Sequence, residues 1–379
     1  MPWTIINMII LSIDTSCDET AVSITKDTKI LANIIWSQAS IHGKWGGVVP
    51  SIAKREHEER IDFVIKNAMT KAFPKTLFSE NNYLVLISRY IDAIAVTVGP
   101  GLAIALEVGI KKAKGLAEKY DKPLVAINHI EGHLLSCLAT PNTDTEALVL
   151  DSIFPALGIV TSGGHTQIVL MEKIGQYKIL ASTIDDALGE ALDKAARMLG
   201  LGYPGGPILE KMAQVGNDKK YLLPVPLIGQ EKRMVFSYSG LKTALHRQVE
   251  KIRLFKKELT KKDIEDLSAV FQKTAFTHFV RVLDWMIVNN KIYGVKNVLA
   301  GGGVMANLEL RKILRRLGKK HSLNIYFPYT KNLYGDNAAM IGIAAYYKRM
   351  RNEYDNEIDK VDRAPNAKID QPFPWQYNP

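Results

Sequence analysis

Residues 91–133 read IDAIAVTVGPGLAIALEVGIKKAKGLAEKYDKPLVAINHIEGH. The stretch opens with a β-rich apolar run at 91–98, which ends in the turn sequence Gly-Pro-Gly-Leu at 99–102. The pattern then predicts a helix from about Ala103 to Tyr120 and a strand at 124–127. This order of strand, turn, helix and strand is typical of an α/β protein with a mixed or parallel sheet. Ligands of such folds bind at strand ends, so the residues that follow the second strand are candidates for function.

Two histidines, His129 and His133, follow that second strand. In a helix, four residues bring the second ring to within about 40° of the first, so both imidazoles can bind one divalent metal ion. Asp336 stands in a polar turn before an apolar helix predicted at 338–347, and its carboxylate is the candidate third ligand. The alternative is a pair of hydrogen-bonded surface histidines.

Zinc proteases use the same histidine spacing, but they require a glutamate directly after the first histidine as general base. That position is Ile130 here. Glu131 lies about 200° around the helix from His129 and would point away from a metal bound by the two rings. A zinc protease is therefore disfavoured.

Length and composition indicate a soluble protein of two lobes. The chain has 379 residues, of which 47% are apolar and 23% charged, and no apolar run approaches the roughly 20 residues needed to span a bilayer. Residues 1–7 do not resemble a secretory signal. Only two cysteines occur, Cys17 and Cys137, which fits a reducing compartment and suggests packing roles for both. We therefore expect a cytoplasmic protein that has no membrane partner.

The chain is basic, with 49 Lys and Arg residues against 39 Asp and Glu residues and a formal charge of +10. This excess favours contact with a polyanion such as nucleic acid, although basic runs are more often solvated helix faces. Aromatic and charged residues alternate in the stretch 233–242, which contains Phe236, Tyr238 and Lys242. We predict that this stretch is a loop that contacts RNA.

A strand-turn-strand pattern occurs twice. Apolar runs at 8–13 and 21–24 flank a polar turn, and runs at 156–160 and 167–171 flank the turn Thr-Ser-Gly-Gly-His-Thr. In the second copy, Gly163 and Gly164 allow backbone N–H groups to approach an anion. Each pattern alone could be an ordinary hairpin, but the pair favours a duplicated phosphate-handling fold.

Three loops in the second half resemble parts of a nucleotide pocket. An acidic turn at 185–194 enters a helix and carries Asp193, which could reach ribose hydroxyls, and the turn 203–207 precedes a helix beginning near Ile208. A glycine run at 300–307 follows a short strand, where a base or phosphate can lie against the main chain. Its spacing differs from G-x-G-x-x-G, so NAD is disfavoured. Each loop alone could be a plain turn.

The motifs occur in the order found in the TsaD family of tRNA N6-adenosine threonylcarbamoyltransferases, which the chain resembles over roughly residues 8–345. They are SCDET (16–20), GGVVP (46–50), GPGL (99–102), HxEGH (129–133), SGGHT (162–166), GEALDK (189–194), YPGGP (203–207), FSYSGLK (236–242) and GGVMAN (302–307). The resemblance implies the actin-like ATPase, sugar kinase and Hsp70 fold, with two lobes around a nucleotide cleft. The expected lobes are 8–140, with a helix at 336–349 packing back onto it, and 145–330, followed by a loose tail at 351–379.

The resemblance also implies a role for individual residues. It makes His129, His133 and Asp336 the ligands of one divalent metal ion, Fe²⁺ or Zn²⁺. The expected contacts to the donor, from its phosphate to its ribose and adenine, are Val160, Thr161, Ser162, Gly163, Gly164, Asp193, Gly206, Glu210 and Asn307. Asp18, Glu19 and His165 would be the catalytic groups, and any of the three could accept a proton.

The implied reaction transfers a threonylcarbamoyl group from threonylcarbamoyl-AMP to N6 of adenosine 37 in tRNAs that read codons beginning with A, releasing AMP. ATP, ADP or AMP could occupy the same cleft. Implied partners are tRNA, a TsaB-like paralogue and a TsaE-like ATPase, and a homodimer is also possible. Two features depart from the family pattern: Asp14 stands where Glu is commoner, and the connection 74–90 is longer than usual.

Two alternatives remain open at this point. A kinase or ATPase of the same fold would need the cleft but no metal-binding histidines. A non-catalytic scaffold would lack the metal and adenine motifs.

Overall fold

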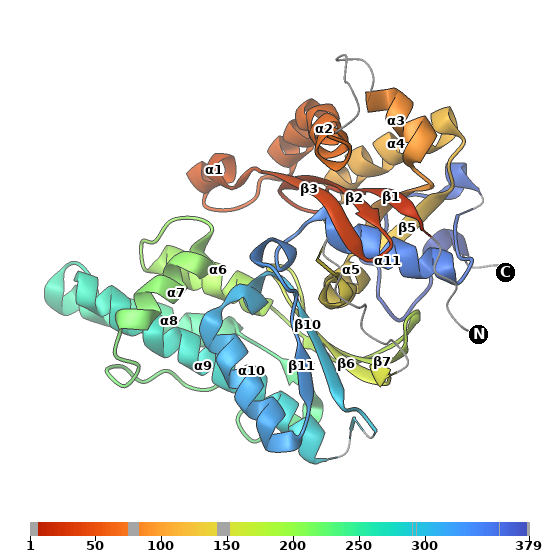
Figure 1. Cartoon of the computed structure of the whole chain (residues 1–379). Helices are drawn as coiled ribbons and strands as arrows, with labels where there is room; N and C mark the ends of the chain where they lie inside the picture. The colour runs from red at the N-terminus through yellow and green to blue at the C-terminus, as the bar shows by residue number, and fades with distance from the viewer. Residues whose placement is uncertain are drawn as a thin grey trace.

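The computed structural model of the chain describes residues 7–74, 83–141, 152–289, 291–292, 294–355 and 357–376. Two α/β lobes each contain one mixed sheet (Figure 1). The first sheet consists of β1 (Ile9–Asp14), β2 (Glu19–Lys26), β3 (Lys29–Ser37), β4 (Ala93–Gly99) and β5 (Leu124–Asn128). The second consists of β6 (Ala156–Thr161), β7 (Thr166–Lys173), β8 (Gln176–Thr183), β9 (Val235–Phe236), β10 (Asn297–Gly301) and β11 (Asn324–Tyr326).

The two sheets share one topology. The strand order of the first is β3-β2-β1-β4-β5, and five strands of the second repeat it as β8-β7-β6-β10-β11. In each sheet the first strand pairs antiparallel with its hairpin partner and parallel with a later strand. The predicted duplication of a strand-turn-strand unit is therefore confirmed.

Helices cover both faces of the first sheet. On one face, α2 (Pro50–Ala72) packs on β2, and α4 (Ala103–Tyr120) packs on β4 and on α2. On the other face, α11 (Ala338–Met350) packs on β1, β2 and β5. The helix expected at 336–349 begins at Ala338, because the Asn337 side chain accepts a hydrogen bond from the Met340 N–H and caps it. Asp336 is therefore outside the helix, in the turn before it.

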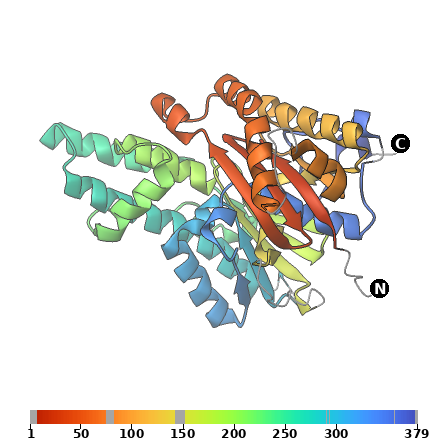
Figure 2. The same ribbon diagram turned by 45° about the horizontal axis from the view of Figure 1, so that its top comes forward.

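The second lobe carries the longer helices. They are α6 (Leu188–Met198), α7 (Gly205–Val215), α8 (Ser239–Lys256), α9 (Lys261–Val288) and α10 (Leu308–His321). Figures 1 and 2 show α8 and α9 extending away from the first lobe. Buried side chains of α9, such as Phe271, Phe276 and Phe279, form much of this lobe's core. A short helix, α5 (His129–Leu135), contacts α11 as well as β6 and β10, so it lies where the two lobes meet.

The predicted loose tail is wrong for the described residues between 351 and 376. The Ala364 N–H donates a hydrogen bond of 2.7 Å to the Val98 carbonyl, and Val361, Ala364 and Phe373 are buried in the core of the first lobe. Asp355 is also buried and accepts a hydrogen bond from the Ala126 N–H. The tail therefore packs against the first sheet, both at the start of β5 and at the end of β4.

Two further predictions concern the long connection at 74–90 and the lobe boundary at 140–145. Residues 75–82 lie outside the described residues and are followed by α3 (Tyr83–Tyr90), and most of the boundary also lies outside them. No helix in the described part of the chain is both long and apolar enough to cross a membrane.

Candidate metal centre and nucleotide cleft

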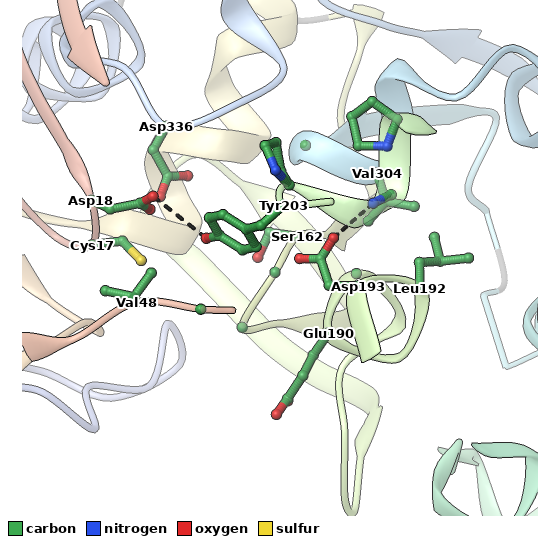
Figure 3. Close-up of a pocket in the computed structure, with 18 of the residues that line it drawn as sticks. Cys17, Asp18, Val48, Ser162, Glu190, Leu192, Asp193, Tyr203, Val304 and Asp336 are labelled. Carbon is green, nitrogen blue, oxygen red and sulfur yellow. Dashed lines mark hydrogen bonds between the residues drawn. The ribbon is translucent and has the colours of Figure 1, made fainter. Parts of the chain in front are cut away.

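A cleft of about 710 Å³ lies between the lobes. The loops after β1 and β4 line one side, and the loops after β6 and β10 line the other, as expected for ligands bound at strand ends. Figure 3 shows side chains from both lobes pointing into this space. Most of the predicted site residues are on its wall: Asp18, Glu19, His129, Ser162, Gly163, Gly164, His165, Asp193, Gly206, Glu210, Asn307 and Asp336.

The two histidines and Asp336 converge, as predicted. The Asp336 Oδ1 atom lies 3.5 Å from Nε2 of His129 and 3.2 Å from Nε2 of His133. Helix α5 starts directly after β5 because Asn128 caps it, accepting a hydrogen bond of 2.9 Å from the Ile130 N–H. This cap fixes where the two rings leave the helix. The packing of α11 against α5 brings Asp336 to them from 200 residues away in sequence.

The geometry of these three side chains fits a divalent cation. Metal–ligand bonds of about 2.1 Å at tetrahedral angles separate ligand atoms by about 3.4 Å. The two measured nitrogen–oxygen distances are 3.5 and 3.2 Å, and all three ligand atoms lie within 4.8 Å of one another. Both ring nitrogens of His133 are buried, and neither forms a hydrogen bond of good geometry with a described residue. Buried nitrogens without hydrogen bonds are costly unless another ligand satisfies them.

The electrostatics of the cluster also favour a cation. Burial lowers the pKa of His129, but Asp336 outweighs burial and raises that pKa to about 9. Burial raises the pKa of Asp336, but His129 and then His133 lower it well below its usual range. The carboxylate thus stays charged and retains a proton on the neighbouring imidazole, in the position that a metal cation would take.

His129 is held from its other side. Its Nδ1 lies 3.2 Å from the Ser16 hydroxyl oxygen and 3.8 Å from Oδ2 of Asp14, and both residues are buried. A second ring nitrogen fixed in this way orients the first toward a metal. Glu131 points elsewhere, because the Tyr177 hydroxyl donates a hydrogen bond of 2.7 Å to its carboxylate. The protease alternative therefore loses its general base, as the sequence predicted.

The turn between β6 and β7 forms a compact wall of the cleft. Ser162 N–H donates to the His165 carbonyl at 2.8 Å, and His165 N–H donates to the Ser162 hydroxyl at 3.1 Å. A Cβ atom on Gly163 or Gly164 would meet nothing within 4 Å, so their backbone faces open space. Val160 and Thr161 do not line the cleft, because both are fully buried strand residues. They are the last two residues of β6 and lead directly into the turn.

Gly189 connects helix α6 to this turn. Its N–H donates to the Ser162 carbonyl at 3.2 Å, and a Cβ atom here would lie 2.4 Å from that same oxygen. Only glycine allows such an approach. The first turn of α6 therefore packs directly against the turn at 162–165.

The four predicted ribose and adenine contacts already have protein partners. Glu210 accepts a hydrogen bond of 2.8 Å from the Leu308 N–H. Asn307 caps α10 through its Oδ1, and its Nδ2 donates to Oε1 of Gln272 at 2.8 Å. Asp193 Oδ1 accepts from the Gly206 N–H at 2.7 Å, as the dashed line in Figure 3 shows. Glu210 and Asn307 thus hold the wall of the cleft in shape.

The three candidate catalytic groups differ in their surroundings. Burial, followed by the charges of His129 and His133, lowers the pKa of His165 to about 3, so its imidazole is neutral. Burial and the nearby Asp18 and Asp336 raise the pKa of Glu19 well above its usual range. The Tyr203 hydroxyl lies 3.5 Å from Oδ2 of Asp18 across the cleft (Figure 3). Sequence reasoning recognised Tyr203 only as part of a turn and missed this contact.

The predicted RNA-contacting loop at 233–242 is wrong. Phe236 and Tyr238 have no exposed surface, and Phe236 stacks on Phe279 in the core of the second lobe. Lys242 forms an ion pair with Asp186. The alternation of aromatic and charged residues marks the start of α8 at a buried corner.

A sequence profile described as tRNA N6-adenosine threonylcarbamoyltransferase, TsaD, matches residues 29–343. The chain belongs to the TsaD family. The Thermosipho africanus tRNA N6-adenosine threonylcarbamoyltransferase is 41% identical over 365 residues, covering 96% of this chain and 100% of the relative. The Bartonella tribocorum protein of the same name is 40% identical over 377 residues, covering 95% of this chain and 94% of the relative.

Solved structures support the fold. Full-length HypF in a phosphate- and nucleotide-bound form matches with a TM-score of 0.54 at 15% identity, covering 91% of this TsaD-family chain and 56% of HypF. HypF from T. kodakarensis matches with a TM-score of 0.53 at 16% identity, covering 93% of this chain and 48% of HypF. The chain thus spans about half the length of HypF, and at this identity the likeness concerns the fold alone. The expected α/β fold with two lobes around a cleft is confirmed.

Proposed function

We propose that this protein transfers a threonylcarbamoyl group from threonylcarbamoyl-AMP to N6 of adenosine 37 in tRNAs that read codons beginning with A. The new bond joins N6 to the carbamoyl carbon, and the bond from that carbon to the phosphate oxygen breaks. AMP leaves with the electron pair, and the amine loses a proton. Membership of the TsaD family supports this activity, and we expect it to take place in the cytoplasm.

The observation that carries the proposal is the convergence of His129, His133 and Asp336 in a cleft that the glycine-containing turn 162–165 also lines. A divalent metal ion bound there, Fe²⁺ or Zn²⁺, would supply Lewis acidity to the carbonyl or phosphate oxygens of the donor. The chain's own task is to fix the three ligands. Asn128 does so by capping α5, and Ser16 does so by holding the far nitrogen of His129.

The second lobe would bind the donor. A Cβ atom on Gly163 or Gly164 would meet nothing within 4 Å, so a phosphate can approach the main chain there, where N–H groups could stabilise the charge that develops as it departs. Asp193 is held by the Gly206 N–H at the edge of the cleft, where a carboxylate can accept hydrogen bonds from ribose hydroxyls. Glu210 and Asn307 contribute by holding α10 and the turn before it in place.

The proton of the amine would pass to Asp18, Glu19 or His165, which all line the cleft close to the metal ligands. Variants separate the three groups: Asp18→Asn, Glu19→Gln and His165→Asn each remove one acceptor while keeping its approximate shape. The acceptor is the residue whose loss lowers the single-turnover rate without weakening donor binding.

Partners follow from the family resemblance. We propose that a TsaB-like paralogue and a TsaE-like ATPase act with this chain on tRNA, with a homodimer as the alternative assembly. Mixing the purified chain with each candidate and measuring mass by light scattering distinguishes a heterodimer from a homodimer.

The decisive experiment is reconstitution. The chain is incubated with tRNA, threonine, bicarbonate, ATP and an adenylate-forming enzyme, with and without the partners, and nucleosides are analysed by mass spectrometry. We expect threonylcarbamoyladenosine in tRNA with adenosine at position 37 and none in a matched transcript with guanosine there. Absence of product in every combination would refute the proposal. ATP-dependent phosphorylation of a small molecule would instead favour a kinase of the same fold.

A further inference from the structure

A second cavity, of about 830 Å³, adjoins the nucleotide cleft on the second lobe. We refer to it as the side groove. Pro207, Glu210 and Ala306 line both cavities, so the two are continuous along one wall. Helices α7 and α10 and the segment 325–334 enclose the side groove.

The side groove is strongly basic. Lys211, Arg311, Arg315 and Lys331 line it, and no carboxylate in the described part of the chain forms an ion pair with any of them. Among the described residues, Glu210 is the only acidic one on its wall, and that carboxylate already accepts the Leu308 N–H. Four cations without protein counter-ions form a site for an anion with several charges.

Aromatic rings lie among these cations. The Arg315 guanidinium is 5.3 Å from the ring centroid of Phe327, and that of Arg311 is 5.3 Å from the ring centroid of Tyr334. Arg311 also donates to the Tyr334 hydroxyl and to the Ala306 carbonyl, at 3.2 and 3.3 Å, while its buried Nε has no partner among the described residues. Tyr329 is 46% exposed, so it can stack against a flat group.

We infer that the side groove binds a nucleotide that flanks the target adenosine in the RNA substrate. The inference rests on the proposed function and names a subsite beyond the adenylate cleft. Enzymes that modify one base take it into a pocket and contact the neighbouring nucleotides outside it. When the target base lies in the cleft, the neighbouring nucleotide lies beside the wall that the two cavities share. There the cations can pair with its phosphate, and Tyr329 can stack on its base.

The side groove is also connected to the metal centre by the main chain. Residues 325–334 form its wall, and the chain reaches Asp336 only two residues later. An acidic peptide would match the cations, but the exposed ring of Tyr329 suits the flat face of a base. RNA bound in the side groove would therefore contact the segment that places a metal ligand.

Charge-removing variants test the inference. The double variant Arg315→Gln with Lys331→Gln is compared with Arg316→Gln and Lys319→Gln, which remove equal charge from α10 outside the side groove. The assay measures Kd for a fluorescent tRNA anticodon stem-loop over a series of salt concentrations. We expect the groove variant to bind about tenfold more weakly than the wild type, and the slope of log K against log salt to fall in magnitude by about 1.4. In the control pair, each of these two changes should be less than half as large.

A second comparison tests stacking. Tyr329→Ala should weaken binding by about tenfold, whereas Tyr329→Phe keeps the ring and should bind as the wild type does. Circular dichroism verifies that each variant is folded.

The outcomes separate this inference from the proposed function. If the wild-type chain modifies tRNA but the groove variants match the control pair in Kd and salt slope, the subsite is wrong and the function stands. If the wild type neither binds nor modifies tRNA, both fail. The remaining case is that the side groove binds a mononucleotide, which calorimetry with ATP tests. Two ATP-binding sites in the wild type and one in the groove variant would overturn the assignment to RNA.

Discussion

His57 should make the stability of the first lobe depend on pH. Its ring is fully buried in α2, where Nδ1 lies 2.8 Å from the Thr20 hydroxyl and Nε2 lies 3.1 Å from the Cys17 carbonyl. It therefore contacts the residue before Asp18 and the residue after Glu19. Burial lowers the pKa of His57 from 6.5 to about 4, because the charged ring would lose its hydration.

The sign and size of the effect follow from this shift. Between pH 6.5 and pH 4 the unfolded chain binds a proton at His57 and the folded chain does not, so the free energy of unfolding falls as pH falls. A shift of about 2.5 units at 1.36 kcal/mol each gives a loss of about 3 kcal/mol, complete below the folded pKa. Above pH 6.5 the ring is neutral in both states and contributes no slope.

Urea unfolding from pH 4.5 to 8 measures this contribution. The variant His57→Gln keeps an amide that can donate to the Cys17 carbonyl but cannot titrate, so the difference between wild type and variant should shrink as pH falls through this window. His246 is exposed on α8, and His246→Gln serves as the matched histidine-to-glutamine control. Parallel pH curves for wild type and His57→Gln would refute the argument, because they would mean that the buried ring does not titrate with a lowered pKa.

Three further outcomes are expected. Asp336→Asn should remove bound metal and abolish tRNA modification without unfolding the chain, as measured by metal analysis and nucleoside mass spectrometry. The control Asp359→Asn changes an exposed residue and should retain both metal and modification. Full product from Asp336→Asn would exclude a role for this ligand. Gly189→Ala should destabilise the second lobe by about 1–3 kcal/mol and weaken donor binding, because the new Cβ meets the Ser162 carbonyl. Thermal unfolding and calorimetry measure these two effects. In the control Gly240→Ala on α8 the new Cβ meets nothing within 4 Å, so this variant should be neutral in both experiments. Phe373→Ala should cost about 3–5 kcal/mol in urea unfolding, because that ring is buried in the first lobe; an unchanged midpoint would show that the tail is not part of the folded core.

Local patterns predicted the elements well where the local signal and the final packing agree. The helix expected at 103–120 has those bounds in the structure, since the turn Gly-Pro-Gly-Leu precedes it and Asp121 ends it in a left-handed conformation. The i,i+4 spacing of His129 and His133 likewise fixed their common face once the helix formed.

Errors arose where packing across the chain determines the outcome. The tail looks disordered because it is charged and rich in proline, yet Val361, Ala364 and Phe373 are isolated apolar residues that fill one end of the first lobe. Phe236 and Tyr238 alternate with polar residues as in an RNA-binding loop, but the core of the second lobe buries both. Neither sequence pattern indicates which part of the fold will bury these apolar residues.

The candidate metal centre depends on one long-range contact. Asp336 reaches the histidines because α11 packs on α5 and on the first sheet, and Gly342 permits that approach: a Cβ there would lie 2.7 Å from the Thr25 hydroxyl. The segment leading into Asp336 comes from the side groove on the second lobe, while α11 belongs to the first. A change in the angle between the lobes must therefore strain this segment or move the carboxylate. Under the proposed function, a metal ion held by Asp336 and RNA held in the side groove would therefore both act on the segment 327–336.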